Sequence, residues 1–172
     1  MTAKNESSLC FFPQRCLACG LCVEACRRQE SRLTAHDGPV PARGRLAVYQ
    51  ANDGPHLAVC RQCTTPPCVE VCPSGALVKD EAGRVVLDSG GCVGCQACVD
   101  VCPFRAIFFE GGIAYKCDLC SGTAAPPCVI ACPQEALLWQ EARQVAAQRR
   151  RFRTRHLDLT AKVDGSGPVS KE

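Results

Sequence analysis

Sixteen cysteines arranged in four groups constrain this chain more than any other feature of its sequence. The third group is a C-x2-C-x2-C-x3-C-P run over residues 92–103, in which three thiolates spaced by two residues can wrap one compact inorganic core. This spacing is typical of cysteines that hold a [4Fe-4S] cluster, and the fourth cysteine of such a run usually serves a neighbouring cluster. Pro103 fixes φ as the chain leaves the site. The sequence therefore predicts iron–sulfur clusters.

The four groups share their last step. Each ends in two cysteines separated by three residues, and a proline follows in every group but the first, where Arg27 stands instead. The second and fourth groups also share a Pro-Pro-Cys sequence, at 66–68 and 126–128, which indicates duplication of one structural unit. The groups, in chain order, are Cys16, Cys19, Cys22 and Cys26; Cys60, Cys63, Cys68 and Cys72; Cys92, Cys95, Cys98 and Cys102; and Cys117, Cys120, Cys128 and Cys132.

The distances between groups predict which of them share clusters. Cys72 and Cys92 are separated as the two motifs of a two-cluster ferredoxin are, so the second and third groups form one continuous ferredoxin-like core. We expect β-hairpins at 76–87 and 106–115, because short apolar runs flank turn sequences there. By exclusion, the first and fourth groups form the other pair.

Residues 27–59 are the longest connection without cysteine, and we expect them to be an insertion on the surface. They contain a turn sequence at 36–39 and a strand-like run at 46–49. His36 and His56 are either solvated loop residues or additional ligands.

The C-terminal part predicts a helix. Residues 135–155 lack Gly and Pro and are rich in good helix formers, and Leu138, Val145 and Phe152 recur one heptad apart as a single apolar stripe. The arginine-rich end of this helix is either a solvated face or a docking site for an acidic surface. We expect the tail from Asp164 to be unstructured.

Composition limits the remaining possibilities. The 17 cysteines are an odd number and the N-terminus has no apolar leader, so we expect a cytoplasmic protein whose thiols bind metal. No stretch approaches the roughly 18 apolar residues of a transmembrane helix, and no membrane insertion is expected. Aromatic residues make up only 5% of the chain, so clusters should replace much of an ordinary core and the apo-protein should be largely unfolded. The formal charge of +3 counts every thiol as neutral and requires no nucleic-acid partner.

The four groups, the Pro-Pro-Cys variants and the seven-residue gap in the fourth group resemble a known family. It is the polyferredoxin-like electron-transfer subunits of molybdenum and tungsten oxidoreductases, with related chains in formate dehydrogenases, hydrogenases, carbon monoxide dehydrogenase and aldehyde oxidoreductases. The resemblance covers about residues 10–138. It implies an α+β fold of two interlocked bacterial 2[4Fe-4S] ferredoxin-like modules with short hairpins and a C-terminal helix. The outer module would comprise 1–59 and 110–138, the inner module 60–109, and the basic helix and flexible tail 139–172.

The resemblance also implies four [4Fe-4S] clusters, each held by cysteines from two paired groups. Because no group lacks a cysteine, we expect no [3Fe-4S] site. The implied ligands are a first set of Cys16, Cys19, Cys22 and Cys132; a second set of Cys60, Cys63, Cys68 and Cys102; a third set of Cys92, Cys95, Cys98 and Cys72; and a fourth set of Cys117, Cys120, Cys128 and Cys26.

The implied function is conduction of single electrons. The partners would be a catalytic subunit, with a tungsten or molybdenum enzyme oxidising an aldehyde or formate favoured, and a second redox subunit or ferredoxin. The chain itself has no phosphate-binding loop, Ser-His-Asp pattern or flavin or nicotinamide site, so we expect it to be non-catalytic. Alternatives are a free-standing polyferredoxin carrier, a subunit that stacks on further copies of itself and, remotely, a zinc-binding structural module.

Two N-terminal features lie outside the four groups. The apolar residues Leu9, Phe11 and Phe12 favour a subunit docked in a complex over a free carrier. Cys10 is expected to be a packed thiol, with a regulatory or reserve ligand as the alternative.

Overall fold

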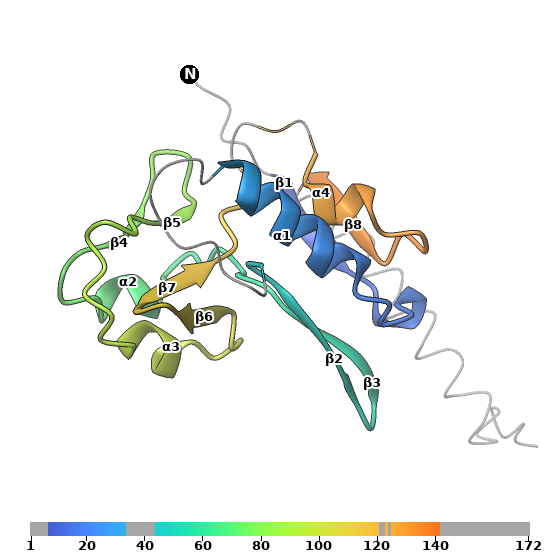
Figure 1. Cartoon of the computed structure of the whole chain (residues 1–172), viewed down its shortest axis with the longest axis horizontal. Coiled ribbons are helices and arrows are strands. Elements are labelled where there is room, and N and C mark those ends of the chain that lie inside the picture. The colour runs from blue at the N-terminus through green and yellow to red at the C-terminus, as the bar shows by residue number, and fades with distance from the viewer. Residues whose placement is uncertain (1–6, 34–43, 121–122, 124, 142–172) are drawn as a thin grey trace, which may run out of the picture.

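Short helices and strand pairs form two lobes in this computed structural model, which describes residues 7–33, 44–120, 123 and 125–141 (Figure 1). The α2–α3 lobe contains α2 (Pro67–Glu70), β4 (Leu77–Lys79), β5 (Val85–Leu87), α3 (Ala97–Val101), β6 (Ile107–Glu110) and β7 (Ile113–Lys116). The α1–α4 lobe contains β1 (Ser7–Phe11), the 3-10 turn η1 (Pro13–Arg15), α1 (Leu21–Leu33), α4 (Pro127–Ile130) and β8 (Leu137–Glu141). A hairpin of β2 (Ala47–Ala51) and β3 (Gly54–Ala58) projects between them.

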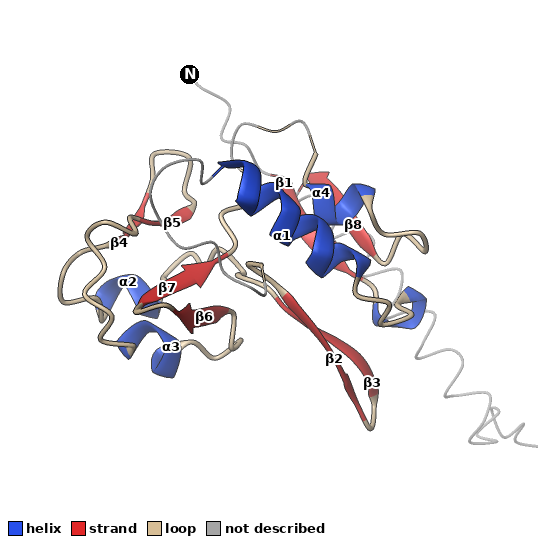
Figure 2. Cartoon of the chain, in the orientation of Figure 1, coloured by secondary structure: helices blue, strands red, loops and turns tan. Residues whose placement is uncertain are grey.

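Each strand of the described part pairs with a single antiparallel partner, and Figure 2 shows these pairs set among short helices. The pairs are β1 with β8, β2 with β3, β4 with β5, and β6 with β7. The β1–β8 pair joins segments from opposite ends of the described chain and so closes the α1–α4 lobe. The described part is an α+β arrangement of short helices and strand pairs.

One structural unit recurs at α2–β4, α3–β6 and α4–β8. A short helix carries the third cysteine of a group, the last cysteine and its proline follow, and the proline prevents continuation of the helix. The third residue after the last cysteine has a positive φ in all three copies, and the first residue of the next strand is buried. The positive-φ residues are Gly75, Arg105 and Glu135, and the buried ones are Leu77, Ile107 and Leu137. The repeat in the sequence is therefore a repeat in the backbone.

The hydrophobic core is divided between the two lobes, and cysteines belong to both parts. In the α2–α3 lobe, the buried residues Leu77, Val85 and Ile107 pack with Cys68 and Cys98. In the α1–α4 lobe the cluster consists of Cys26, Leu46, Leu57, Val59, Cys117, Cys128 and Leu137. Sulfur atoms thus occupy positions that aliphatic side chains fill in an ordinary core.

The two hairpins predicted from the sequence are confirmed as β4–β5 and β6–β7. The β4–β5 turn closes through Asp80, whose carboxylate accepts a hydrogen bond from the Arg84 backbone N–H at 2.7 Å and forms an ion pair with its guanidinium. The left-handed Gly83 (φ 79°) completes this turn.

The helix predicted over 135–155 is wrong at its beginning, because Leu137–Glu141 form β8. Phe11 pairs with Leu137, which is only 2% exposed, and Leu9 pairs with Trp139. Backbone hydrogen bonds to β1 and burial of Leu137 outweigh the helical propensity of this segment. The remainder of the expected helix, its arginine-rich end and the tail lie outside the described residues.

The connection 27–59 differs from the surface insertion that we expected. Leu46 is 1% exposed and Leu57 is 8% exposed, and both belong to the core of the α1–α4 lobe. The apolar face at the base of the β2–β3 hairpin is buried because it packs beside the cysteines of this lobe. Residues 34–43 lie outside the described part.

The helices are short. The longest one described, α1, has 13 residues, and α2 and α4 have four each. Within the described ranges, no helix is long and apolar enough to span a bilayer.

Candidate metal centres

A left-handed residue follows the first cysteine of each group by two positions. This shared conformation turns backbone N–H groups toward sulfur: Ala18 N lies 3.4 Å from Cys16 Sγ, and Leu119 N lies 3.4 Å from Cys117 Sγ. The four left-handed residues are Ala18 (φ 52°), Gln62 (φ 51°), Gly94 (φ 71°) and Leu119 (φ 65°). Backbone donors of this kind stabilise a thiolate that binds metal.

The last cysteine of each group also accepts a hydrogen bond. Ala106 N donates to Cys102 Sγ at 3.5 Å, and Ala136 N donates to Cys132 Sγ at 3.2 Å. Burial opposes ionisation of Cys72, but N–H groups of the following residues and the Ser74 hydroxyl outweigh it and lower its pKa. Cys26 lies inside α1, and its donor comes from a distant segment: Arg45 N lies 3.3 Å from Cys26 Sγ.

The structure brings the first set together around a hollow of about 390 Å³, open solvent included. All four of its cysteines line this hollow, although Cys132 is far from the others in sequence. Burial is the main cause that raises the pKa of Cys22 to about 11, and the charges of Cys132, Cys16 and Cys19 add to it. These four thiols therefore face one another.

The third set surrounds a second hollow, of about 330 Å³ with open solvent included. Burial raises the pKa of Cys98, and the charges of Cys92, Cys72 and Cys95 raise it further. Cys72 comes from the preceding group and lines the same hollow, while the exchange of last cysteines between clusters stays a prediction.

Charges within the second and fourth sets also act on one another. Burial raises the pKa of Cys60, and the charges of Cys63 and Cys102 act in the same direction. Burial likewise raises the pKa of Cys68, which Cys60 and Cys102 raise further.

In the fourth set, burial raises the pKa of Cys117 to about 12, with Cys26 and Cys120 adding to it. Burial is also the main cause that raises the pKa of Cys128, and the charges of Cys117 and Cys26 raise it further. Cys26 therefore joins the last group, although α1 carries it within the first.

The donor chemistry of each set fits a [4Fe-4S] cluster. Such a cluster is commonly held by four thiolates, and hydrogen bonds to sulfur together with burial tune its potential. Each set supplies four cysteines from two groups, and backbone N–H groups reach sulfur atoms in every set. The raised pKa values of the buried thiols mean that binding iron must release protons.

Two residues beside the cysteine sets could not be identified from the sequence. Lys116 is buried (3% exposed) beside the second set, and Gln62 bonds through its side chain to the backbone of the fourth. Neither belongs to a metal-binding pattern, and only their placement in the fold marks them.

Among the other candidates, His56 pairs with Asp53 at the exposed end of the β2–β3 hairpin, with 2.8 Å between Nε2 and Oδ1. His36 lies outside the described residues. Cys10 is 3% exposed on β1, opposite Leu138 of β8. Phe11 packs partly buried against the core of the α1–α4 lobe, which limits its part in the docking patch expected from the sequence.

Replacing Gly94 by Ala should destabilise the α2–α3 lobe. Gly94 has φ 71°, and a Cβ there would lie 2.4 Å from the carbonyl oxygen of Gly112, so the backbone would have to move. We expect Gly94→Ala to lower the melting temperature of the iron-loaded protein and its iron content. Gly75→Ala is the matched control, because Gly75 (φ 67°) has open space around its Cβ position and should cost only the 1–2 kcal/mol or so of a left-handed residue. Equal losses in both variants would contradict this account.

A chain that assembles its cysteines in this way is an iron–sulfur protein. The sequence matches the 4Fe-4S dicluster domain family over residues 56–142 and a 4Fe-4S binding domain over residues 13–29. The first match spans half of the chain, which therefore belongs to the 4Fe-4S dicluster domain family. Its cofactors are [4Fe-4S] clusters.

Curated relatives carry related names. The beta subunit of NADH-dependent phenylglyoxylate dehydrogenase from Aromatoleum evansii is 40% identical over 52% of this chain and 20% of its own length. The thiosulfate reductase electron transfer subunit PhsB of Salmonella typhi is 33% identical over 53% of this chain and 49% of its own. The polyferredoxin-like subunit of aliphatic sulfonate oxidoreductase from Pyrococcus furiosus is 37% identical over 49% and 47%. The chain thus spans less than half the length of each of these relatives.

Proposed function

We propose that this chain is a non-catalytic subunit that conducts single electrons through four [4Fe-4S] clusters within an oxidoreductase complex. When bound, each cluster would accept and release one electron. The relatives named as electron-transfer or polyferredoxin-like subunits support the general role. The ligands would be the four sets of cysteines defined above.

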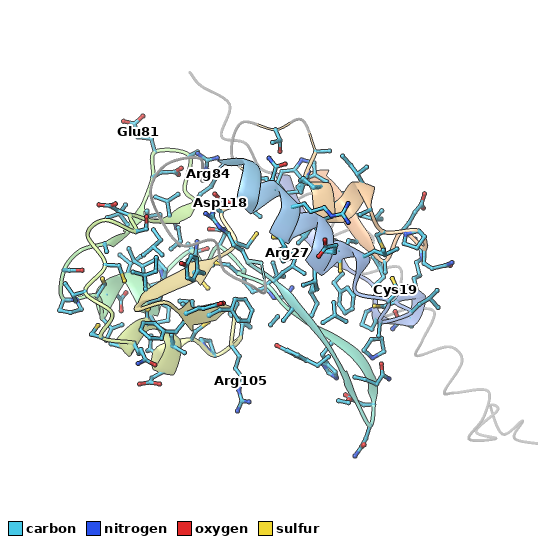
Figure 3. All side chains as sticks on the ribbon, viewed as in Figure 1. Cys19, Arg27, Glu81, Arg84, Arg105 and Asp118 are labelled. Atoms are coloured by element: carbon cyan, nitrogen blue, oxygen red, sulfur yellow. The ribbon has the colours of Figure 1, made fainter. Side chains whose placement is uncertain are left out.

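The observation that carries this proposal is the burial pattern of the four sets. Cys19 of the first set and Cys95 of the third set are exposed, and they lie in different lobes; Figure 3 labels Cys19 in the α1–α4 lobe. In the fourth set, Cys26, Cys117 and Cys128 are buried, and Cys68 of the second set is buried too. The first and third sets thus each have one exposed cysteine and the second and fourth have none, which suits a conductor with an entrance and an exit.

Contacts between sets support one order along the path. Cys68 of the second set and Cys98 of the third belong to one core cluster, and α2 contacts α3. The Cys22 charge acts on Cys128, which supports a position of the first set beside the fourth. Gln62, which lies between Cys60 and Cys63 of the second set, donates a hydrogen bond to the Cys117 carbonyl of the fourth. The proposed order is third, second, fourth and first.

Apolar residues beside both exposed sets would suit contact with redox partners. Leu17 follows Cys16 and is 66% exposed, and Val93 follows Cys92 and is 67% exposed. The corresponding residues after the first cysteines of the enclosed sets are Arg61 and Asp118. Exposed apolar side chains beside a cofactor are typical of docking sites.

The favoured partner is a tungsten or molybdenum enzyme that oxidises an aldehyde or formate, with a second redox protein at the other end. This choice rests on the resemblance of the four cysteine groups to subunits of such complexes. A free-standing carrier would use the same clusters and differs only in having no permanent partner.

Metal analysis tests the proposal. The tagged chain should be purified from its native host without oxygen, and Fe, Zn, Mo and W measured per chain. About 16 Fe with co-purified Mo or W would support four clusters wired to such an enzyme. About 16 Fe with neither metal would favour the free carrier or a partner of another class, for which Ni is the next measurement. About four Zn with little Fe would overturn the proposal.

A further inference from the structure

Lys116 is a buried charge at the junction of the two lobes. It ends β7, and it is the one charged residue of the described ranges whose side chain is fully buried, at 3% exposed. Its ammonium donates hydrogen bonds to the carbonyl oxygens of Val85 and Cys117, the second at 2.9 Å. Carbonyl dipoles alone compensate poorly for a cation that has left water, so a buried lysine needs nearby negative charge.

Gln62 holds this junction together. Its amide nitrogen donates to the Cys117 carbonyl at 2.9 Å, and its amide oxygen accepts from the Val85 backbone N–H at 2.7 Å. Both Gln62 and Lys116 therefore bridge the same two backbone segments, Val85 in β5 and Cys117 at the start of the fourth group. Gln62 itself lies between Cys60 and Cys63 of the second set.

The negative charge beside Lys116 comes from the second set. In the described part of the chain, no carboxylate lies within ion-pair distance of its ammonium. Burial raises the pKa values of Cys60 and Cys68, and the Lys116 charge acts against that rise in both. After burial, the main charges that act on Cys117 are instead those of Cys26, Asp118 and Cys120. The geometry agrees, because Gln62, which lies between Cys60 and Cys63, donates to the same Cys117 carbonyl oxygen as the Lys116 ammonium.

We propose that Lys116 raises the reduction potential of the cluster held by Cys60, Cys63, Cys68 and Cys102. This inference rests on the proposed function. Four thiolates on an oxidised cluster core leave a net negative charge, and reduction adds one more. A fixed ammonium in a buried, low-dielectric site stabilises the reduced form more than the oxidised form, so the potential rises.

A purely structural role would give a different result. If Lys116 only ties β5 to β7, any loss of hydrogen bonds in the network would disturb the protein in the same way as loss of the charge. Four variants separate the two accounts. Lys116→Gln removes the charge but keeps a donor. Gln62→Glu leaves Lys116 in place, adds an opposing negative charge and gives up the hydrogen bond to the Cys117 carbonyl, a loss that Gln62→Asn controls for. Lys116→Arg keeps the charge, and Gln62→Asn removes the hydrogen bonds of the amide without altering charge while tolerating the left-handed backbone.

The experiment is an EPR-monitored redox titration of the anaerobically purified holoprotein. Lys116→Gln and Gln62→Glu should each lower one midpoint potential by about 59 mV or more, a tenfold change in the ratio of reduced to oxidised cluster at a fixed potential. Lys116→Arg and Gln62→Asn should shift every midpoint potential by less than this amount, and their iron content should match that of the wild type. An unchanged potential in both Lys116→Gln and Gln62→Glu, or an equal shift in Gln62→Asn, would overturn the inference. Wild-type iron and cluster signals are measured in the same samples, so failure of the proposed function would show separately, as missing clusters.

Discussion

Removal of iron should abolish the cooperative thermal unfolding of this protein. Cysteines are part of both hydrophobic clusters, and the largest fully buried side chains in the described chain are three leucines and one valine, namely Leu46, Leu77, Leu137 and Val85. The sheets have two strands each, and such a pair is marginal at best without packing. Helices of four or five residues cannot persist alone. Cluster binding therefore contributes much of the folding free energy.

The measurement is far-UV circular dichroism against temperature, before and after anaerobic chelation of iron. We expect a sharp transition for the holoprotein and a broad, low-amplitude change for the iron-depleted chain. A cooperative transition in the fully depleted protein would contradict this prediction.

A second consequence concerns the pH dependence of cluster retention. Burial raises the thiol pKa of Cys22 to about 11 and that of Cys117 to about 12. Each thiol must lose a proton to bind iron, so cluster retention should fall as the pH is lowered.

Replacing Cys132 by Ser should damage the same cluster as replacing Cys19, although 112 positions separate the two residues. Both line the hollow of the first set, together with Cys16 and Cys22. We expect each variant to lose up to about four of about 16 iron atoms, with the same component missing from the EPR spectrum. Cys117→Ser should remove a different component, because that thiol interacts with the fourth set.

Cys10→Ser is the control for these variants. The thiol is buried on β1 but belongs to none of the four sets, so iron content and spectrum should not change. If the Cys132→Ser spectrum matched that of Cys117→Ser instead, the exchange of cysteines between the first and fourth groups would be wrong.

The cysteine pattern was informative because cluster chemistry demands it. Four thiolates must reach one small core from a short loop, and few spacings allow this, so the third group alone indicates the cofactor. The two hairpins were equally predictable, since turn residues such as Asp80 and Gly83 act through local geometry. Local rules failed at Leu137–Glu141, where good helix formers make β8 because β1 offers backbone hydrogen bonds and a buried position.

The sequence by itself determined the kind of cofactor, and it predicted the grouping of its ligands and an α+β class, because these depend on residue type and short-range spacing. Only the tertiary structure decided which sets face solvent, how Arg45 reaches Cys26, and how Lys116 and Gln62 come to join β5 to the fourth group. These features depend on segments far apart in the chain. Their energies come from burial and hydrogen bonding in a particular arrangement, which no local pattern of residues encodes.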